Sequence, residues 1–298
     1  MTITNAFTVD VEDYYHVTAF ENRIQRQHWN RYESRVVAST NRLLEMLDRN
    51  KTRGTFFILG WVAHQHPQLV RDIFRAGHEI GSHSYWHQLI YNQTPDEFRS
   101  DLRLSRDVLQ DILGQAITLY RAPSFSITQR SLWALEILAE EGFKIDSSIF
   151  PTYHDRYGIR DAPTEIHLIP TNGGSIWEFP PAVLKTRLGN LPISGGGYFR
   201  LYPLWLINRC VKKMNRSGQP YMFYVHPWEV DPDQPKLPSH SRVKTWRHRV
   251  NLKTTFSKLD LLLKRFQFGT MSDVLSQFSS SGSSLSEQSK KAYIQTAS

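Results

Sequence analysis

Short β-like runs alternate along the chain with longer segments in which apolar residues recur at helical spacing. The strand-like runs occupy residues 6–11, 54–60, 78–82, 117–120, 144–146 and 221–225. Helical spacing is found over residues 39–50, 132–141, 203–215 and 256–266, and further helices are expected to begin near Pro67 and Met271. Repeated strand–helix units predict an α/β fold with a parallel sheet or barrel, with functional residues at the C-terminal ends of the strands.

The clearest helix signal begins at Thr94. Thr94 and Glu97 form the pattern of a capping box, Pro95 follows at the first helical position, and Gly114 is placed to end the helix. In contrast, Pro and Gly are frequent over residues 151–197, which predicts loops and short strands there. From Ser279 onward the sequence SSSGSSLSEQSKK predicts a disordered tail.

Composition adds two constraints on the chain of 298 residues. Cys210 is the single cysteine, so the chain cannot form an internal disulfide. The N-terminal sequence MTITNAFTVDVEDYY lacks a basic start, a long apolar core and a small-residue cleavage site, and no apolar run approaches the roughly 20 residues of a spanning helix. We therefore expect a soluble protein in the cytoplasm.

The formal net charge is +8, and much of the excess lies between Arg242 and Arg265. In that segment only Asp260 opposes a group of cations, which comprises Lys244, Arg247, Arg249, Lys253, Lys258 and Lys264. One interpretation is a solvated surface. The other is a patch that makes peripheral contact with anionic membrane headgroups or with a phosphorylated glycan carrier. No nucleic-acid-binding motif accompanies the charge, so nucleic acid is not an expected partner.

Carboxylates cluster where the first predicted strand ends, in the sequence Asp10-Val11-Glu12-Asp13. Clustered carboxylates raise one another's pKa, and such groups commonly hold a cation or move a proton. An exposed acidic turn would have the same sequence.

Histidines follow the third predicted strand in the segment GHEIGSHSYWH. His83 and His87 stand four positions apart, so one helical turn would place both imidazoles on one face. Two histidines and one carboxylate leave open positions on a divalent metal, as in hydrolytic centres. Structural histidines remain the alternative.

Two further segments end strands with charged residues. Arg121 begins RAPSFS, where an arginine can pair with a carboxylate and hold it ionised. His226 lies in YVHPWE, at the end of an apolar strand, where it could donate a proton to a leaving group. Taken alone, each segment is also compatible with a purely structural role.

In this order, the four segments resemble the polysaccharide deacetylase family, carbohydrate esterase family 4. The resemblance covers about residues 6–228, and its most specific part is the His-Ser-x-x-His segment after Gly-His-Glu-Ile-Gly-Ser. The stretch Asp146-Ser147-Ser148 is similar to the family's Asp-x-Ser stretch. The resemblance implies a distorted (β/α) barrel with fewer than eight regular strands and a C-terminal extension. It also implies a catalytic domain over residues 1–229, an extension over 230–278 that packs on the barrel, and the tail over 279–298.

The resemblance also implies roles for individual residues. Asp10 would be the general base, Arg121 would tether it, and His226 would be the general acid. His83 and His87 would bind a divalent metal, with Zn²⁺ as the expected ion. A backbone N–H near Ser124 would help to hold the oxyanion.

The acidic segment departs from the usual family pattern of two adjacent Asp residues, because Val11 follows Asp10. It resembles a divergent branch with peptidoglycan deacetylases and allantoinase-like proteins, in which the acids are spaced by one residue. Strand alternation puts Glu12 on the same side as Asp10, which favours Glu12 as the third metal ligand, with Asp13 as the other candidate.

The function implied is metal-dependent hydrolysis of N-acetyl groups on amino sugars of a polysaccharide or its precursor, which is cleavage of a linear amide C–N bond. The segments DVEDYYH, HPWEVDPDQP and RHRVNLKTT look like a bacterial subgroup linked to exosortase-type loci and exopolysaccharide assembly. For a cytoplasmic enzyme, the expected substrate is a glycan or a lipid-linked glycan before export. The alternatives are an amide hydrolase for a small cyclic ureide or imide, which needs a closed pocket, and a catalytically silent glycan-binding protein.

Overall fold

A mostly parallel sheet forms the centre of the molecule in the computed structural model, which describes residues 3–21, 23–154, 157–187, 189–237 and 242–280. Its strand order is β10-β1-β2-β3-β4-β5-β7-β6, and β11 also pairs with β1. The strands are β1 (Asn5–Val11), β2 (Thr55–Ile58), β3 (Glu79–Ser82), β4 (Leu119–Tyr120), β5 (Ile145–Asp146), β6 (His167–Thr171), β7 (Gly174–Glu178), β10 (Met222–Val225) and β11 (Phe268–Gly269). Neighbouring strands run parallel, except that β6 is antiparallel to β7.

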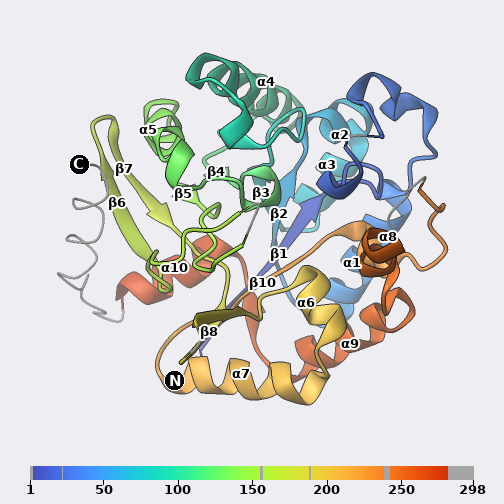
Figure 1. The fold of residues 1–298 in the computed structure, drawn as a ribbon, viewed down its shortest axis with the longest axis vertical. Helices are drawn as coiled ribbons and strands as arrows, with labels where there is room; N and C mark the ends of the chain where they lie inside the picture. The colour runs from blue at the N-terminus through green and yellow to red at the C-terminus, as the bar shows by residue number, and fades with distance from the viewer. Residues whose placement is uncertain (1–2, 22, 155–156, 188, 238–241, 281–298) are drawn as a thin grey trace.

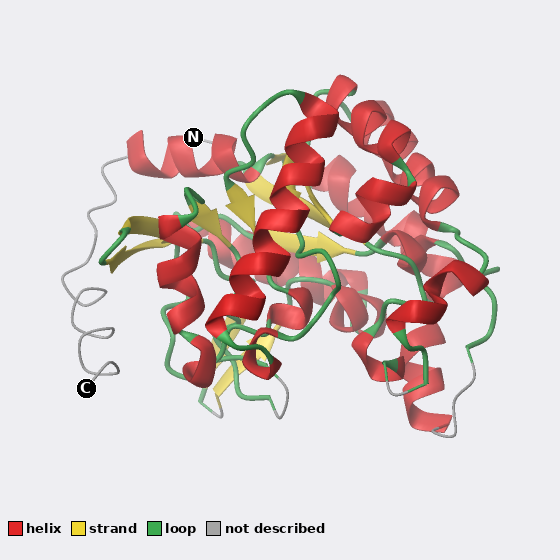
Figure 2. Ribbon diagram, turned by 90° about the horizontal axis from the view of Figure 1, so that it is seen from above, coloured by secondary structure: helices red, strands yellow, loops and turns green. Residues whose placement is uncertain are grey.

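Helices cover the sheet, with α4 and α5 on one side and α7 along the opposite edge in Figure 1. From a second direction, the strands lie inside a shell of helices (Figure 2). The helices are α1 (Val36–Arg49), α2 (Gly60–Gln65), α3 (Pro67–Arg75), α4 (Pro95–Leu113), α5 (Trp133–Glu140), α6 (Gly196–Leu201), α7 (Leu204–Arg216), α8 (Arg242–Arg249), α9 (Leu252–Arg265) and α10 (Met271–Ser280). A hairpin of β8 (Val183–Thr186) and β9 (Gly189–Pro192) lies apart from the main sheet, and short 3-10 turns cover residues 18–20 and 26–31.

The α/β class predicted from the sequence is confirmed, and each of the six predicted strands is present. Helix α4 has the predicted capping box between Thr94 and Glu97, and Gly114 ends it with a φ of 68° in the left-handed region. Among the described strands, no ladder joins β10 to β6, so the sheet has two ends and is not a closed ring.

Four elements were not predicted, namely α2, α6, α8 and β11, and two helices begin earlier than expected. The helix expected at 256–266 begins at Leu252, and the helix expected at 39–50 begins at Val36. Helix α8 has the sequence RVKTWRHR, in which only two residues are apolar, so no helical periodicity is visible. Helix α2 is six residues long, too short for such a pattern to develop.

Strand β1 is buried along its whole length because helices and strands cover both of its faces. Phe7, Val9 and Val11 pack into the main apolar core, whereas Thr8 and Asp10 alternate with them and point toward the polar groups of the site. Burial therefore fixes the register of β1, and with it the position of Asp10.

The C-terminal segment contacts the first strands of the sheet. Strand β11 pairs with Asn5 and Ala6, and the Met271 N–H donates to Thr55 Oγ1 at 2.9 Å. The domain boundary at residue 229/230 stays a prediction. Most of the tail expected to be disordered, residues 281–298, lies outside the described residues, whereas Ser279 and Ser280 end helix α10. No described helix combines the length and the apolar character needed to cross a membrane.

Candidate active site

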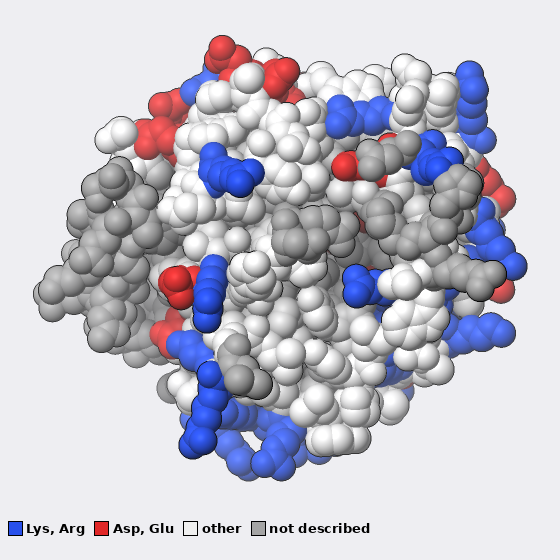
Figure 3. Space-filling view, in the orientation of Figure 1, with Lys and Arg blue, Asp and Glu red and all other residues white. Residues whose placement is uncertain are grey.

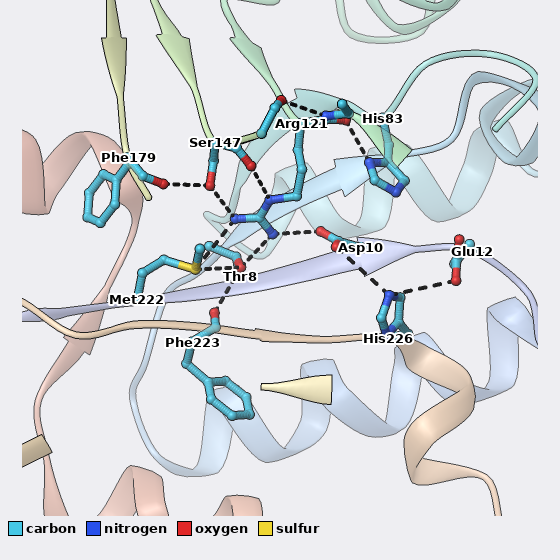
Figure 4. Close-up of polar contacts among 12 residues, drawn as sticks. Thr8, Asp10, Glu12, His83, Arg121, Ser147, Phe179, Met222, Phe223 and His226 are labelled. Carbon is cyan, nitrogen blue, oxygen red and sulfur yellow. Dashed lines mark hydrogen bonds and ion pairs between the residues drawn. The ribbon is translucent and has the colours of Figure 1, made fainter. Parts of the chain in front are cut away.

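Five of the residues singled out in the sequence lie together at the C-terminal ends of strands β1, β3, β4 and β10 (Figure 4). Asp10 belongs to β1, and Glu12 follows that strand directly. His83, Arg121 and His226 each come immediately after a strand. Parallel strands bring these ends to one edge of the sheet, which is where an α/β fold carries its functional side chains.

Arg121 holds Asp10 in place. The Arg121 side chain is fully buried, and its Nη1 donates to Asp10 Oδ1 at 2.7 Å and to Thr8 Oγ1 at 2.8 Å. Its guanidinium carbon also lies 4.2 Å from the centroid of the Phe57 ring. A buried arginine fork of this kind restricts the carboxylate to one orientation, and the second oxygen of Asp10 lies 3.9 Å from His226 Nε2.

The Asp-Ser-Ser stretch after β5 supports this arginine. Arg121 Nη2 donates to Ser147 Oγ at 2.9 Å, and Ser147 Oγ in turn donates to the Phe179 carbonyl oxygen at 2.7 Å. Ser148 Oγ accepts from the Ala122 N–H at 2.8 Å, which fixes the turn that follows Arg121. These serines therefore position the arginine and do not themselves face the open site.

Glu12, His83 and His87 form the one group among the described residues with the arrangement of a metal site. One ligand atom from each lies within 4.8 Å of the other two, and all three residues are buried. Glu12 Oε2 lies 2.6 Å from His87 Nε2, yet this buried oxygen has no hydrogen-bond partner. A buried carboxylate oxygen without a hydrogen-bond partner, beside an imidazole nitrogen, is the arrangement expected where a cation binds.

His83 is prepared as a ligand by its surroundings. Its Nδ1 lies 2.8 Å from the Arg121 carbonyl oxygen, so Nδ1 carries the proton and Nε2 presents its lone pair. Burial lowers the pKa of His83 to about 4, which keeps the imidazole neutral. Neutral histidines and one carboxylate are donors that suit Zn²⁺, so the residues present fit a divalent metal.

The segment from His83 to His87 is not the helical turn that the spacing predicted. Ser84 and His87 have positive φ values of 63° and 52°, so the chain forms an irregular loop. The Asp101 carboxylate on α4 accepts from the N–H groups of Tyr85 and Trp86 at 2.9 and 3.0 Å and holds this loop. The two imidazoles still meet, with ring centroids 5.5 Å apart, but a distant carboxylate brings them together instead of helix geometry.

Asp13 has a different task from Glu12, and the structure does not bring it to the histidines. One of its oxygens accepts from Ser34 Oγ at 2.8 Å, from the Arg35 N–H at 2.9 Å and from the Val36 N–H at 3.2 Å. Asp13 therefore caps the first turn of α1, where no side chain of the helix itself does so. The geometry selects Glu12 and corrects the inclusion of Asp13 among the metal ligands.

His226 faces the same site from the end of strand β10. Its Nδ1 lies 2.7 Å from Glu229 Oε1, whereas its Nε2 lies 3.9 Å from Asp10 and 3.7 Å from Glu12. Burial acts to lower the pKa of His226, but Glu12, Glu229 and Asp10 outweigh it and raise the pKa to about 9. The ring therefore carries its proton at neutral pH and directs Nε2 toward the space between Asp10 and Glu12.

Glu229 and Arg200 complete the environment of His226 and were not predicted. Glu229 Oε2 accepts from Arg200 Nε at 2.7 Å, and both side chains are buried. The sequence did contain a signal for Glu229, because it follows His226 by three positions within YVHPWE. Arg200 lies 26 residues before His226 in a Gly-rich segment, where nothing indicated its contact. Thr8 was likewise missed, although it faces Arg121 through strand alternation.

A cavity of about 590 Å³ opens beside His87. Aromatic side chains of Tyr15, Trp29 and Trp86 line it, together with amides that include Gln88. The exposed residues Glu21, Gln25, Arg26 and Gln27 line it as well. An open, partly aromatic hollow therefore adjoins the candidate site at His87.

Comparison with known protein families divides the chain in two. A family model described as polysaccharide deacetylase matches residues 30–143, which include His83, His87 and Arg121. The chain carries a polysaccharide deacetylase domain. A second model, described as a domain of unknown function (DUF3473), matches residues 147–276. This second matched region supplies His226, Glu229 and Arg200 to the site.

Several relatives of the polysaccharide deacetylase domain are named as peptidoglycan deacetylases. A peptidoglycan-N-acetylglucosamine deacetylase of Bacillus cereus is 33% identical over 98 residues, which are 33% of this chain and 36% of the relative. A peptidoglycan deacetylase of Helicobacter pylori is 30% identical over 121 residues, 39% of this chain and 40% of the relative. In four of these curated relatives, the matched segment covers between 18% and 46% of the relative's own length.

A solved structure shares the fold over almost the whole chain. A structure from Mycobacterium smegmatis, named as a candidate polysaccharide deacetylase, superimposes with a TM-score of 0.61 at 21% identity. The match covers 94% of this chain and 91% of that one, so it includes the C-terminal half. The fold that the two structures share therefore includes segments on both sides of residue 147.

Proposed function

We propose that this polysaccharide deacetylase chain is a metal-dependent hydrolase that removes N-acetyl groups from amino sugars of a polysaccharide or its precursor. The observation that carries the proposal is the convergence of two sets of groups. Asp10, oriented by Arg121, and His226, oriented by Glu229, lie beside the Glu12–His83–His87 group and 3.9 Å from each other. A hydrolase for an amide needs a base, an acid and a means of stabilising the oxyanion.

Glu12, His83 and His87 would hold the divalent metal, with Zn²⁺ as the expected ion. When bound, such a cation supplies Lewis-acid chemistry, which polarises the amide carbonyl and favours ionisation of water. The remaining chemistry belongs to the side chains. Asp10 accepts a proton from the water that attacks the acetyl carbon, and the oxygen that becomes negative is held by donors that include a backbone N–H near Ser124.

His226 then completes the reaction. Its protonated Nε2 gives a proton to the amine nitrogen as the carbon–nitrogen bond breaks, which leaves acetate and a free amino sugar. Glu229 keeps Nδ1 occupied, so the proton available for transfer is the one on Nε2. Asp10 and His226 therefore act in opposite directions within one cycle, one taking a proton and the other giving one.

The shape of the approach favours a glycan over a small cyclic ureide or imide. The hollow beside His87 is open, and the exposed Trp86 offers an aromatic face on which a sugar ring can stack, whereas a small ring would need a closed pocket. The complete set of acid, base and ligand groups disfavours a silent glycan-binding protein, which has no need of all of them. Peptidoglycan or exopolysaccharide precursors, lipid-linked before export from the cytoplasm, are the proposed substrates.

Acetate release from a panel of N-acetylglucosamine oligosaccharides tests this proposal. The purified full chain is assayed with and without chelator and with Zn²⁺ restored, beside Asp10→Asn and the control Asp111→Asn. Asp111 lies exposed on α4, so its substitution makes the same change of charge away from the site. We expect chelator-sensitive release that Asp10→Asn loses and Asp111→Asn keeps.

Other outcomes point elsewhere. Normal release by Asp10→Asn would refute the role of Asp10 as the base. Hydrolysis of a cyclic ureide or imide without release from any glycan would favour the small-substrate alternative. Absence of both hydrolysis and metal binding would favour a silent binding protein.

A further inference from the structure

One face of helix α7 carries a stripe of cationic side chains far from the active site. Arg209, Lys212, Lys213 and Arg216 follow one another at spacings of three, one and three residues, and all are exposed. Arg265, at the end of α9, joins them in lining a cavity of about 630 Å³. Figure 3 shows Lys and Arg gathered along the lower edge of the molecule, where α7 lies in Figure 1.

These cations lack counter-charges within the described part of the chain. No ion pair or hydrogen bond joins any of the five to another described side chain, and no acidic residue lines the cavity. Helix α4 shows the contrast, because its Arg99, Arg103 and Arg106 all pair with Glu141. Five neighbouring cations without acids repel one another, so this surface gains from an anionic partner.

Apolar side chains adjoin the cationic stripe. Trp205, in the first turn of α7, is 67% exposed and lines the same cavity, and Leu201 just before the helix is 45% exposed. A binding site for free phosphate has no use for an exposed indole. Tryptophan beside basic residues on one helix is typical of segments that lie at the surface of a membrane, with the ring at the level of the headgroups.

Within the basic segment expected from the sequence to contact membranes, three cations have partners inside the protein. Lys258 donates to the carbonyl oxygens of Phe199 and Tyr202, and Lys264 pairs with Asp260. Arg249 donates to main-chain carbonyls of the loop before α8. Arg265, the last cation of this segment, lines the same cavity as the α7 stripe.

We propose that the face of α7 with Arg265 binds the surface of an anionic membrane. Lipid phosphates would lie among the five cations, and Trp205 would enter the headgroup layer. This inference does not rest on the proposed deacetylase activity. If both hold, the enzyme is retained at the surface where a lipid-linked glycan is found.

Vesicle sedimentation with the full chain tests the proposal. Vesicles of phosphatidylcholine are compared with vesicles that also contain phosphatidylglycerol, and binding is expected only to the anionic ones. The test variant replaces four residues by glutamine, namely Arg209, Lys212, Lys213 and Arg216. The control makes the same change at four exposed cations elsewhere, namely Arg31, Lys51, Arg130 and Lys144.

A cation near an anionic surface contributes about fivefold to binding, so the α7 variant should bind about several hundredfold more weakly. The control should lose far less, although both variants carry the same net charge. Trp205→Ala should weaken the binding that persists at high salt, where charge is screened. Both glutamine variants should keep normal acetate release from a soluble oligosaccharide, so a failure of the deacetylase proposal is seen separately.

Three results would overturn the inference. They are equal losses in the two glutamine variants, no binding of the unaltered chain to anionic vesicles, and saturable binding of inorganic phosphate without any vesicle binding. The last of these would identify the α7 cavity as a site for a small anion.

Discussion

The adjacent carboxylates of Glu12 and Asp13 should respond to substitution in opposite ways. Glu12 belongs to the group that fits a metal, whereas Asp13 caps helix α1. Glu12→Gln is therefore expected to abolish metal binding. The stability of the metal-free protein should change little, because the glutamine carbonyl oxygen can still accept from Trp228 Nε1 as Glu12 Oε1 does. Asp13→Ala is expected to destabilise the fold and to leave metal affinity intact.

The contacts of each residue determine how large the expected losses of metal affinity and of unfolding free energy are. Replacing a residue that only supports a metal ligand costs about 10-fold to 100-fold in affinity, so loss of the Glu12 ligand should exceed about 100-fold. Asp13→Ala removes the acceptor for the N–H groups of Arg35 and Val36, for Ser34 Oγ and for the Tyr14 N–H. A lost cap costs about 1 kcal/mol, and each buried donor left unpaired costs about 1–3 kcal/mol. Because water can reach part of this turn, we expect a total of about 2–4 kcal/mol.

Two measurements separate these effects. Zn²⁺ affinity is determined by competition with a chromophoric chelator, and the free energy of unfolding by urea titration of the metal-free protein. The assignment is refuted if folded Asp13→Ala loses as much Zn²⁺ affinity as Glu12→Gln. It is also refuted if Glu12→Gln binds Zn²⁺ like the unaltered chain.

Three further substitutions test the groups around the site. Burial raises the pKa of Asp146 to about 6 and raises the pKa of Glu178 well above its usual 4.5. The folded state therefore binds these protons more tightly than the unfolded state does. The stability that this contributes is present below about pH 4 and is lost as the pH rises through 6. Glu178→Gln should therefore flatten the decline in unfolding free energy between pH 4 and 7, and urea titrations with parallel pH profiles would contradict this. Arg121→Lys keeps the charge but loses the fork that orients the base, so kcat should fall about 100-fold with little change in KM, and a fall confined to KM would argue against the positioning role. Glu229→Gln should lower kcat by about 10-fold to 100-fold because His226 loses its partner, and unchanged kcat across pH would exclude that contribution.

The fold could be predicted wherever a signal was local. The ends of α4 were predictable because the capping box, the following proline and Gly114 each act within a few residues of the chain. Strand β1 was predictable from its short apolar run. Helix α8 was not, because RVKTWRHR lacks apolar periodicity. The joining of β11 to β1 depends on contacts across more than 250 residues, which no local pattern encodes.

For the site as well, local patterns could be predicted from the sequence and long-range contacts could not. Asp10, Arg121 and His226 stood out because each lies at the end of a predicted strand, and strand ends meet at one edge of a parallel sheet. Taken alone each allowed a structural role, so their roles came from the resemblance to the polysaccharide deacetylase family. The choice between Glu12 and Asp13 followed from alternation along β1, but the use of Asp13 as the cap of α1 depends on a helix that begins 23 residues later. For the same reason, no sequence pattern could reveal that Arg200 supports Glu229.

Arg121 explains why the base and the metal ligands keep a fixed geometry although they come from different strands. Its side chain holds Asp10 of β1, and its carbonyl oxygen accepts from His83 at the end of β3. Its other guanidinium nitrogen is held by Ser147 after β5. One residue at the end of β4 therefore joins the base to a metal ligand, through its side chain on one side and its main chain on the other. Because the carbonyl contact does not depend on the side chain, Arg121→Lys should disturb the base while metal affinity is retained, which separates the two halves of the site.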